Sequence, residues 1–248
     1  MRLEGRTAVI SGAASGIGRA TAEALADAGA HVILVDINAA GGEAAAAAIR
    51  AHGHGADFLR VDLTELASIE ALRSEALALR ERVDIVANVA GWGKTEPFVK
   101  NTPEFWRKMI DLNLLGTIHL TRAFLDPMIE RRAGKIVNVA SDAGRVGSLG
   151  ESVYSGTKGG VIAFTKGLAR EMARFDINVN CVCPGPTDTP LMAAVPEKLK
   201  EAFAHATPMR RLARPSEVAD AILFFASARA DFVTGQVLSV SGGLTMAG

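Results

Sequence analysis

The fold can be read outward from residues 7–30, TAVISGAASGIGRATAEALADAGA. The stretch begins with a short apolar run typical of a buried strand and continues with apolar residues at helical spacing. Between the two patterns stand Gly12, Gly16 and Gly18, spaced G-x-x-x-G-x-G. Glycines in such a turn let the backbone come close to a pyrophosphate that faces the helix N-terminus. Glycine also serves any tight strand–helix turn, so the loop indicates a nucleotide site only because of its place between a first strand and a first helix.

The same alternation of strand and helix continues along the whole chain. Further apolar runs predict six more strands, at 31–36, 56–63, 83–91, 134–141, 177–185 and 235–243. Helical patterns fall between them, at 38–53, 65–82, 152–174 and 215–228, with two more within 102–132. Strands that are almost entirely apolar indicate a parallel sheet covered by helices on both faces. We therefore expect an α/β fold, a doubly wound, Rossmann-like parallel sheet, in a single domain over residues 1–248.

An acidic residue closes the second predicted strand. Asp36 ends the run HVILVD, about twenty residues after the glycines. A carboxylate at this place can accept hydrogen bonds from adenosine ribose hydroxyls and repels a 2′-phosphate. No arginine that could bind such a phosphate stands at Ser15 or at Ile37. The sequence therefore predicts NAD rather than NADP as cofactor; the alternative is a strand-end Asp that caps the next helix.

Composition argues against several classes of partner. Basic and acidic residues number 27 each, so the formal net charge is zero, and no polybasic run is present. This balance disfavours a nucleic acid or an anionic membrane surface as partner. No apolar stretch approaches the roughly 20 residues that span a bilayer. The N-terminus runs directly into a strand pattern without the apolar core of a signal peptide, so we expect a cytoplasmic protein.

Two cysteines, Cys181 and Cys183, stand at positions i and i+2 of a predicted strand. Both would point to the same face, in a geometry that does not favour a disulfide between them. No further Cys or His ligands that would complete a metal site are evident nearby. We expect the pair to be buried small hydrophobes, and we predict no metal site.

The chain has one tyrosine, Tyr154, which stands four positions before Lys158. On a helix these residues share a face, so a phenol and an ammonium would lie side by side as a candidate acid/base pair. A free phenol has a pKa of about 10, and lowering it to ~7 requires roughly 4 kcal/mol of preferential stabilisation of the phenolate. A neighbouring ammonium supplies part of this. The spacing alone is also typical of an ordinary amphipathic helix.

Together these features resemble the short-chain dehydrogenase/reductase family in its compact, single-domain form. The resemblance covers essentially the whole chain and rests on motifs in the family's order, SGAASGIG (11–18), NVAG (88–91), LNLLGT (112–117), NVAS (138–141), YSGTK (154–158) and PGPTDT (184–189). Ser11 replaces the usual Thr and keeps its hydroxyl, whereas Val89 departs from the usual N-N-A-G. The resemblance implies hydride transfer between a nicotinamide cofactor and a carbon that bears an alcohol or ketone, and a homotetrameric assembly.

The resemblance also implies roles for individual residues. Tyr154 would be the acid/base, Ser141 would orient the substrate oxygen, Lys158 would also bind the nicotinamide ribose, and Asn113 would anchor a water that relays protons to Lys158. Without the resemblance, Ser141 reads as a turn residue and Asn113 as a surface polar residue. The positions implied to contact the cofactor are Gly12, Ser15, Gly16, Ile17, Gly18, Asp36, Ile37, Asp62, Leu63, Asn88, Ala90, Gly91, Tyr154, Lys158, Pro184, Gly185, Thr187 and Thr189.

The substrate end is expected at residues 186–212, which resemble the family's mobile substrate lid. Candidate substrate contacts are Ser141, Tyr154, Trp92, Arg145, Gly150, Leu191 and Met192. Arg145, Arg210 and Arg211 are also the cations that could meet an anionic substrate tail.

Three blocks resemble one subgroup of the family more closely, namely NVASDAGRVGS (138–148), NCVCPGPTDT (180–189) and TGQVLSVSGGLTMAG (234–248). These look like the dehydrogenases that oxidise 2-hydroxycyclohexanecarbonyl-CoA. The expected reaction is NAD-dependent oxidation of a small-molecule β-hydroxyacyl-CoA thioester. Alternatives are a 3-oxoacyl-[acyl-carrier-protein] reductase, a general cyclic secondary-alcohol dehydrogenase, and an NAD-binding regulator without turnover.

Overall fold

The protein is described here by a computed structural model, which covers residues 1–193 and 195–247. Its centre is a sheet of seven parallel strands in the order β3-β2-β1-β4-β5-β6-β7. The strands are β1 (Thr7–Ser11), β2 (His31–Asp36), β3 (Ala56–Arg60), β4 (Ile85–Asn88), β5 (Gly134–Val139), β6 (Ile177–Pro184) and β7 (Val237–Val240). The predicted doubly wound parallel sheet is confirmed. Each predicted strand is present, β2 with the predicted bounds and the others in a shorter form.

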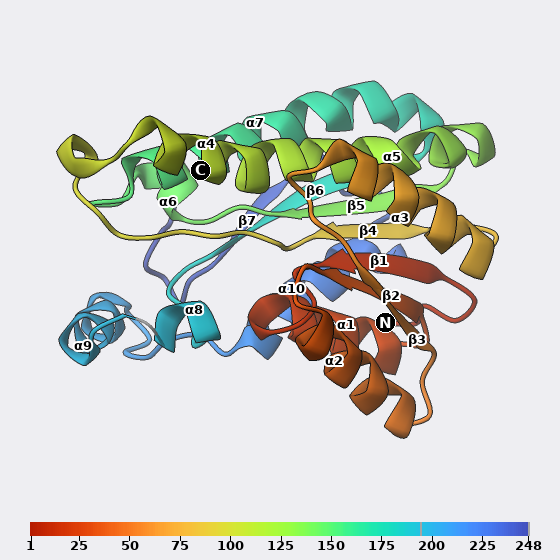
Figure 1. Cartoon of the computed structure of the whole chain (residues 1–248), viewed down its shortest axis with the longest axis horizontal. Helices are drawn as coiled ribbons and strands as arrows, with labels where there is room; N and C mark the ends of the chain where they lie inside the picture. The colour runs from red at the N-terminus through yellow and green to blue at the C-terminus, as the bar shows by residue number, and fades with distance from the viewer. Residues whose placement is uncertain (194, 248) are drawn as a thin grey trace.

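Helices cover both faces of this sheet (Figure 1). One layer contains α1 (Gly16–Asp27), α2 (Ala39–Ala51) and α10 (Pro215–Ala226). The other contains α3 (Leu66–Leu79), α4 (Pro103–Ile110), α5 (Gly116–Arg131) and α7 (Ser152–Met172). Within the described residues, no helix combines the length and apolar character needed to cross a membrane.

The alternation of side chains along the strands divides the core between the two layers. Ile10 of β1 faces α1, α2 and α10, whereas its neighbour Val9 faces the layer of α3, α5 and α7. In β2, Leu34 and Ile33 divide in the same way. Because every inner strand is buried on both sides, its sequence is an unbroken apolar run rather than an alternating one.

The sequence patterns did not resolve four short helical elements. The two helical patterns within 102–132 form a nearly continuous rod, because a π-helical turn at Asp111–Leu115 joins α4 to α5. A one-turn helix, α6 (Ala143–Val146), follows β5. The expected lid carries two helices, α8 (Pro190–Ala193) and α9 (Glu197–Ala206), set apart from the sheet (Figure 1). That this segment moves as a lid, and that the chain works as one domain, remain predictions.

The order of the strands reverses between β1 and β4, since β2 lies on one side of β1 and β4 on the other. At such a switch point two neighbouring loops leave the carboxyl ends of the strands in opposite directions and open a crevice. The loop after β1 contains the predicted glycines, and the loop after β4 contains Gly91. The fold therefore brings the two sequence motifs together at one edge of the sheet.

Candidate active site

The glycine-rich loop has no side chain at the positions where its backbone packs most closely against neighbouring segments. Gly12 has φ +69°, and a Cβ there would lie 2.8 Å from the Cα of Ala90. A Cβ at Gly18 would overlap the carbonyl oxygen of Gly12 and lie 2.5 Å from its carbonyl carbon. The start of α1, at Gly16, is therefore held directly against the end of β1, where its free N–H groups can receive an anion. This cradle fits the diphosphate of a dinucleotide.

Ser11 ties the two sides of the crevice together. Its buried hydroxyl accepts hydrogen bonds from the backbone N–H groups of Val89, at 3.0 Å, and of Ala90, at 3.2 Å. The side chain of Val89 packs against the core formed with α1 and α10. The apolar side chain at this departure from the usual Asn is thus used in packing, while the backbone of the strand end is held by Ser11.

Asp36 is fixed between the glycine-rich loop and the start of α2. One carboxylate oxygen accepts a hydrogen bond from Ala14 N, at 3.0 Å, and the other from Asn38 N, at 2.9 Å. Asn38, not Asp36, caps α2, because its side chain accepts a hydrogen bond from Gly41 N at 3.1 Å. The alternative of a simple capping Asp is therefore wrong, and the carboxylate stands at the crevice.

Tyr154 and Lys158 lie on one face of α7, as the spacing predicts. The ammonium of Lys158 is 5.9 Å from the centre of the Tyr154 ring and donates a hydrogen bond to the carbonyl oxygen of Val139, at 2.9 Å. The loop after β4 is pressed onto both side chains. A Cβ at Gly91 would lie 3.1 Å from Nζ of Lys158, and one at Gly93 would lie 3.1 Å from the Tyr154 ring. The loop is bare of side chains at both contacts.

Burial shifts the pKa values of this pair in opposite directions. It raises the pKa of Tyr154 to about 12; the hydroxyl of Ser141 works against this rise, and the carboxylate of Glu151 adds to it. Burial lowers the pKa of the Lys158 ammonium to about 8. Each change disfavours the charged form in a site of low polarity. The sequence predicted that Lys158 would lower the tyrosine pKa, but in this geometry burial outweighs the ammonium, which points to Val139.

Asn113 lies in the π-helical turn and is completely buried. Its side-chain oxygen accepts a hydrogen bond from Trp92 N, and its amide donates to Trp92 O, both at 2.8 Å. This two-point clamp fixes the loop that lies against Tyr154 and Lys158. A π-helical turn within a long helix often marks a functional site. The surface reading of Asn113 is wrong, and its proposed role in a proton relay remains a prediction.

The side chain of Asn88 is buried and makes its hydrogen bonds inside the protein. Its amide donates to Asn138 Oδ1, at 2.8 Å, and to Thr121 Oγ1, at 2.9 Å. Asn138 in turn donates to Thr165 of α7, at 2.9 Å. The side chain of Asn88 therefore links β4, β5 and the helices that cover them, and the sequence pattern gave no sign of its partners because they lie 33 and 50 residues away.

The PGPTDT loop approaches the glycine-rich loop from the other side. A Cβ at Gly16 would lie 3.3 Å from the methyl group of Thr189. Thr187 is buried and donates to Gly185 O at 2.9 Å, and a Cβ at Gly185 would lie 2.8 Å from that of Ser241. Asp62, another predicted cofactor position, lies after β3, where hydrogen bonds from Thr64 hold its pKa below the ordinary value. The loops that carry the predicted cofactor positions thus lie along the carboxyl edge of the sheet from β3 to β6, and contact of these residues with a cofactor remains a prediction.

The chain is similar to known proteins along almost its whole length. A family model described as enoyl-(acyl carrier protein) reductase matches residues 12–245. The cis-4-hydroxycyclohexanecarboxylate dehydrogenase of Sinomonas cyclohexanicum is 42% identical over 97% of this chain and 96% of its own. A 3-oxoacyl-[acyl-carrier-protein] reductase of Aquifex aeolicus is 36% identical over 98% of this chain and 99% of its own. The chain belongs to the short-chain dehydrogenase/reductase family.

A solved structure in the family shows the same fold over nearly the whole length. The actinorhodin polyketide ketoreductase, crystallised as a variant with NADPH, has a TM-score of 0.94 and 33% identity, and the match covers 98% of this chain and 99% of that one. Members of this family are oxidoreductases that bind a nicotinamide cofactor and interconvert secondary alcohols and ketones. Glycines at the crevice and an acid/base pair beside it suit that chemistry.

The three arginines that were expected to meet an anionic part of the substrate all have hydrogen-bond partners within the protein. Arg145 is turned toward β7, where it donates to Val237 O at 3.3 Å and Ser239 Oγ at 3.0 Å, and also to Ala247 O. Arg211 forms two hydrogen bonds with the carboxylate of Glu217, at 2.7 and 2.6 Å. Arg210 donates to His205 O. The arginines expected to meet an anionic tail are thus engaged within the protein.

The remaining substrate candidates belong to α8, to the loop after β4 and to the segment before α7, and their contact with a substrate remains a prediction. Leu191 and Met192 belong to α8, and half of the Leu191 side chain is exposed. The indole of Trp92 packs edge-on against Phe105 of α4. Gly150 accepts a hydrogen bond from Glu96 N at 2.8 Å, a contact that joins the loop after β4 to the start of α7. Within the loop after β4, the sequence singled out Ala90, Gly91 and Trp92 but not residues 93–96.

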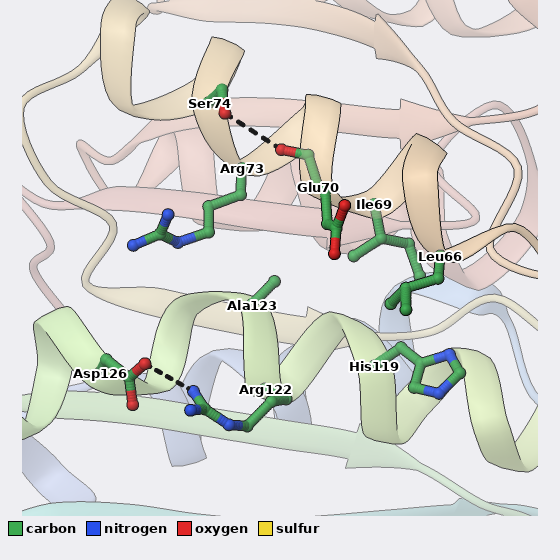
Figure 2. A pocket seen from close by; sticks show the side chains of 9 residues that line it. All are labelled: Leu66, Ile69, Glu70, Arg73, Ser74, His119, Arg122, Ala123 and Asp126. Atoms are coloured by element: carbon green, nitrogen blue, oxygen red, sulfur yellow. Dashed lines mark hydrogen bonds and ion pairs between the residues drawn. The ribbon is translucent and has the colours of Figure 1, made fainter.

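A hollow elsewhere on the surface lies between α3 and α5 (Figure 2). Its cavity volume is about 440 Å³, and Glu70, Arg73, His119 and Arg122 are among the side chains around it. Arg122 forms an ion pair with Asp126 at 2.8 Å. The hollow is lined by helices that cover one face of the sheet rather than by the loops at its carboxyl edge, so it is separate from the candidate active site.

Proposed function

We propose that this protein oxidises a secondary alcohol on a saturated ring to the ketone, with NAD as cofactor and a hydroxycyclohexanecarboxylic acid as substrate. The observation that carries the proposal is the pairing of Tyr154 with Lys158 at the crevice, in a chain 42% identical to a cis-4-hydroxycyclohexanecarboxylate dehydrogenase. The bound nicotinamide would take up the hydride from the ring carbon. Tyr154 would take the hydroxyl proton, Ser141 would hold the oxygen, and Lys158 would bind the nicotinamide ribose.

Two features support NAD and a free acid. The carboxylate of Asp36 is held at the crevice by Ala14 and Asn38, where it would accept from ribose hydroxyls and repel a 2′-phosphate. A CoA thioester carries several phosphates, for which arginine is the preferred partner. The arginines expected to supply that contact are engaged with β7, His205 and Glu217 instead. This favours the cyclic-alcohol reading over the thioester reading.

The second candidate is a 3-oxoacyl-[acyl-carrier-protein] reductase, which the 36% identity to the Aquifex aeolicus enzyme favours. The two are separated by one set of assays with purified protein. NADH formation from cis-4-hydroxycyclohexanecarboxylate, with little from 2-hydroxycyclohexanecarbonyl-CoA or with NADP, would support the proposal. Faster oxidation of NADPH with a 3-oxoacyl thioester would overturn it in favour of the reductase.

A further inference from the structure

One wall of the site is made by two loops that meet beside Tyr154. We call residues 93–96 the rim loop. Its first residue, Gly93, lies against the tyrosine, since a Cβ there would be 3.1 Å from the ring. Its last residue, Glu96, donates its backbone N–H to Gly150 O at 2.8 Å, and Thr95 donates to the side chain of Glu151 at 3.4 Å. The rim loop therefore begins at the candidate acid/base and ends at the segment that leads into α7.

The rim loop contains one cation, Lys94, in the residue directly after the Tyr154 contact. Its ammonium forms an ion pair with Glu96 at 2.8 Å, and 59% of its side chain is exposed. An ion pair this exposed contributes little to stability, so it can exchange partners at small cost. Glu96 has a second partner, because its other carboxylate oxygen accepts from Asn101 Nδ2 at 3.0 Å. The hydrogen bonds of Lys94 and Asn101 hold the pKa of Glu96 below its usual value.

Other cations around the site have partners elsewhere in the protein. Arg145 and Arg211 are held by β7 and by Glu217, as described above. Lys108 lies over the indole of Trp92, 4.3 Å from the ring centre, on the α4 side of the loop. Lys158 is buried and bonded to Val139. Lys94 follows directly after the Gly93 contact with Tyr154, and its ion pair with Glu96 is exposed and replaceable.

We propose that Lys94 is the specificity-determining residue that binds the carboxylate of the substrate, exchanging its contact with Glu96 for the substrate anion. The inference rests on the proposed function, because it assumes a ring alcohol that also carries a free carboxylate. A 1,4-substituted ring places the carboxylate across the ring from the hydroxyl. With the hydroxyl at Tyr154, a flexible lysine that follows the Gly93 contact can reach the far side of that ring.

The test compares an acid with its neutral ester. KM is measured for cis-4-hydroxycyclohexanecarboxylate and for its methyl ester, with the unaltered protein and with Lys94→Met, Lys94→Arg and the matched control Lys100→Met. Lys100 is an exposed lysine at the end of the short helix Phe98–Lys100, and it has the same charge. A hydrogen bond to a charged group contributes ~1.5 kcal/mol at the lower end of its range, so Lys94→Met should raise KM for the acid about tenfold relative to the ester. Lys94→Arg should restore most of this preference, and Lys100→Met should leave it unchanged.

Removal of the competing carboxylate gives a second, opposite readout. Glu96→Gln keeps the side chain's size and its contact with Asn101, and releases Lys94. KM for the acid should fall in this variant while KM for the ester stays the same. Equal changes for acid and ester in both the Lys94 and Glu96 variants would overturn the role of Lys94, and would leave the ring-alcohol function standing.

A binding measurement separates this inference from the proposed function. If the unaltered protein oxidises neither acid nor ester, the proposed function is wrong, and Lys94 is judged by calorimetric titration of cyclohexanecarboxylate into protein with NAD. Affinity that is about tenfold weaker in Lys94→Met, but unchanged in Lys100→Met, would support the anion site by itself. Equal affinity in both variants, or no binding at all, would overturn it.

Discussion

The ammonium of Lys158 lies 5.9 Å from the centre of the Tyr154 ring, yet it gives its hydrogen bond to Val139 O rather than to the phenol. Burial therefore sets both pKa values, raising that of Tyr154 to about 12 and lowering that of Lys158 to about 8. In this state the tyrosine is a neutral phenol, suited to give a proton to a forming alkoxide. To take a proton from an alcohol it needs additional positive charge beside it, which oxidised nicotinamide would supply.

Tyr154→Phe removes the only phenol of the chain and keeps the ring against Gly93. Proton transfer by a positioned side chain accounts for about 10²–10⁴ in rate, so we expect turnover to fall by about 10³. NAD affinity should change little, because the glycine-rich loop and Asp36 lie elsewhere in the crevice. The two quantities are measured by initial rates and by quenching of protein fluorescence. Residual activity above a tenth of the original would show that another group moves the proton.

Lys158→Met should abolish activity and yet stabilise the fold at neutral pH. Moving the lysine pKa from 10.5 to about 8 corresponds to roughly 3 kcal/mol of destabilisation below pH 8, where the buried ammonium stays charged. The variant also leaves the buried carbonyl oxygen of Val139 without a hydrogen-bond donor, which costs about 1–3 kcal/mol of stability. We therefore expect a net gain of about 1 kcal/mol in the free energy of unfolding at pH 7.

The pH dependence of that difference checks its cause. Between pH 8 and 10.5 the unfolded chain binds the lysine proton and the native protein does not, so the stability of the unaltered protein rises with pH relative to the variant. Urea unfolding at pH 7 and pH 10 measures both proteins. Lys166→Met, an exposed lysine of the same helix, is the control and should show no such change. A constant difference between the two pH values would contradict the burial argument.

The fold could be predicted because its signals are local and repeated. Apolar strands, helical spacing and the glycines after β1 lie within short windows of sequence, and all seven strands are where the patterns indicated. The π-helical turn at Asp111–Leu115 could not be read in this way. A shift of hydrogen bonds within a helix leaves the apolar spacing almost unchanged, so the sequence showed two helices where the structure has one long rod.

The site was predictable where a role depends on backbone position and much less so where it depends on the direction of a long side chain. Tyr154 and Lys158 share a helix face because they stand four residues apart on one helix. Gly12 and Gly18 meet within a single strand–helix turn. Arg145 instead donates hydrogen bonds to residues of β7 that lie 92 and 94 positions away in the sequence, and no local pattern reveals these partners. The rim loop was missed for a related reason, since its contact with Gly150 joins distant parts of the chain. The homotetramer and the cytoplasmic location remain predictions.

Asp36→Asn should relax the choice of cofactor without loosening the loop. The amide oxygen can still accept from Ala14 or Asn38, but the negative charge that would repel a 2′-phosphate is gone. We expect the ratio of kcat/KM for NADP over NAD to rise at least tenfold. Asp27→Asn, at the other end of α1, is the control and should leave the ratio unchanged. An unaltered preference in Asp36→Asn would mean that this carboxylate does not face the ribose.

Gly18→Ala tests whether the cradle at the start of α1 needs a bare backbone. The new Cβ would overlap the carbonyl oxygen of Gly12, so the helix and the strand end must move apart. Such overpacking costs about 1–3 kcal/mol, and we expect a loss of that size in the free energy of unfolding together with weaker NAD binding. The matched control is Gly167→Ala in α7, where nothing lies within 4 Å of the added Cβ and helix propensity should add about 0.5–1 kcal/mol. Urea unfolding and cofactor titration measure both variants, and a Gly18→Ala protein that keeps its stability and its NAD affinity would show that the loop tolerates a side chain there.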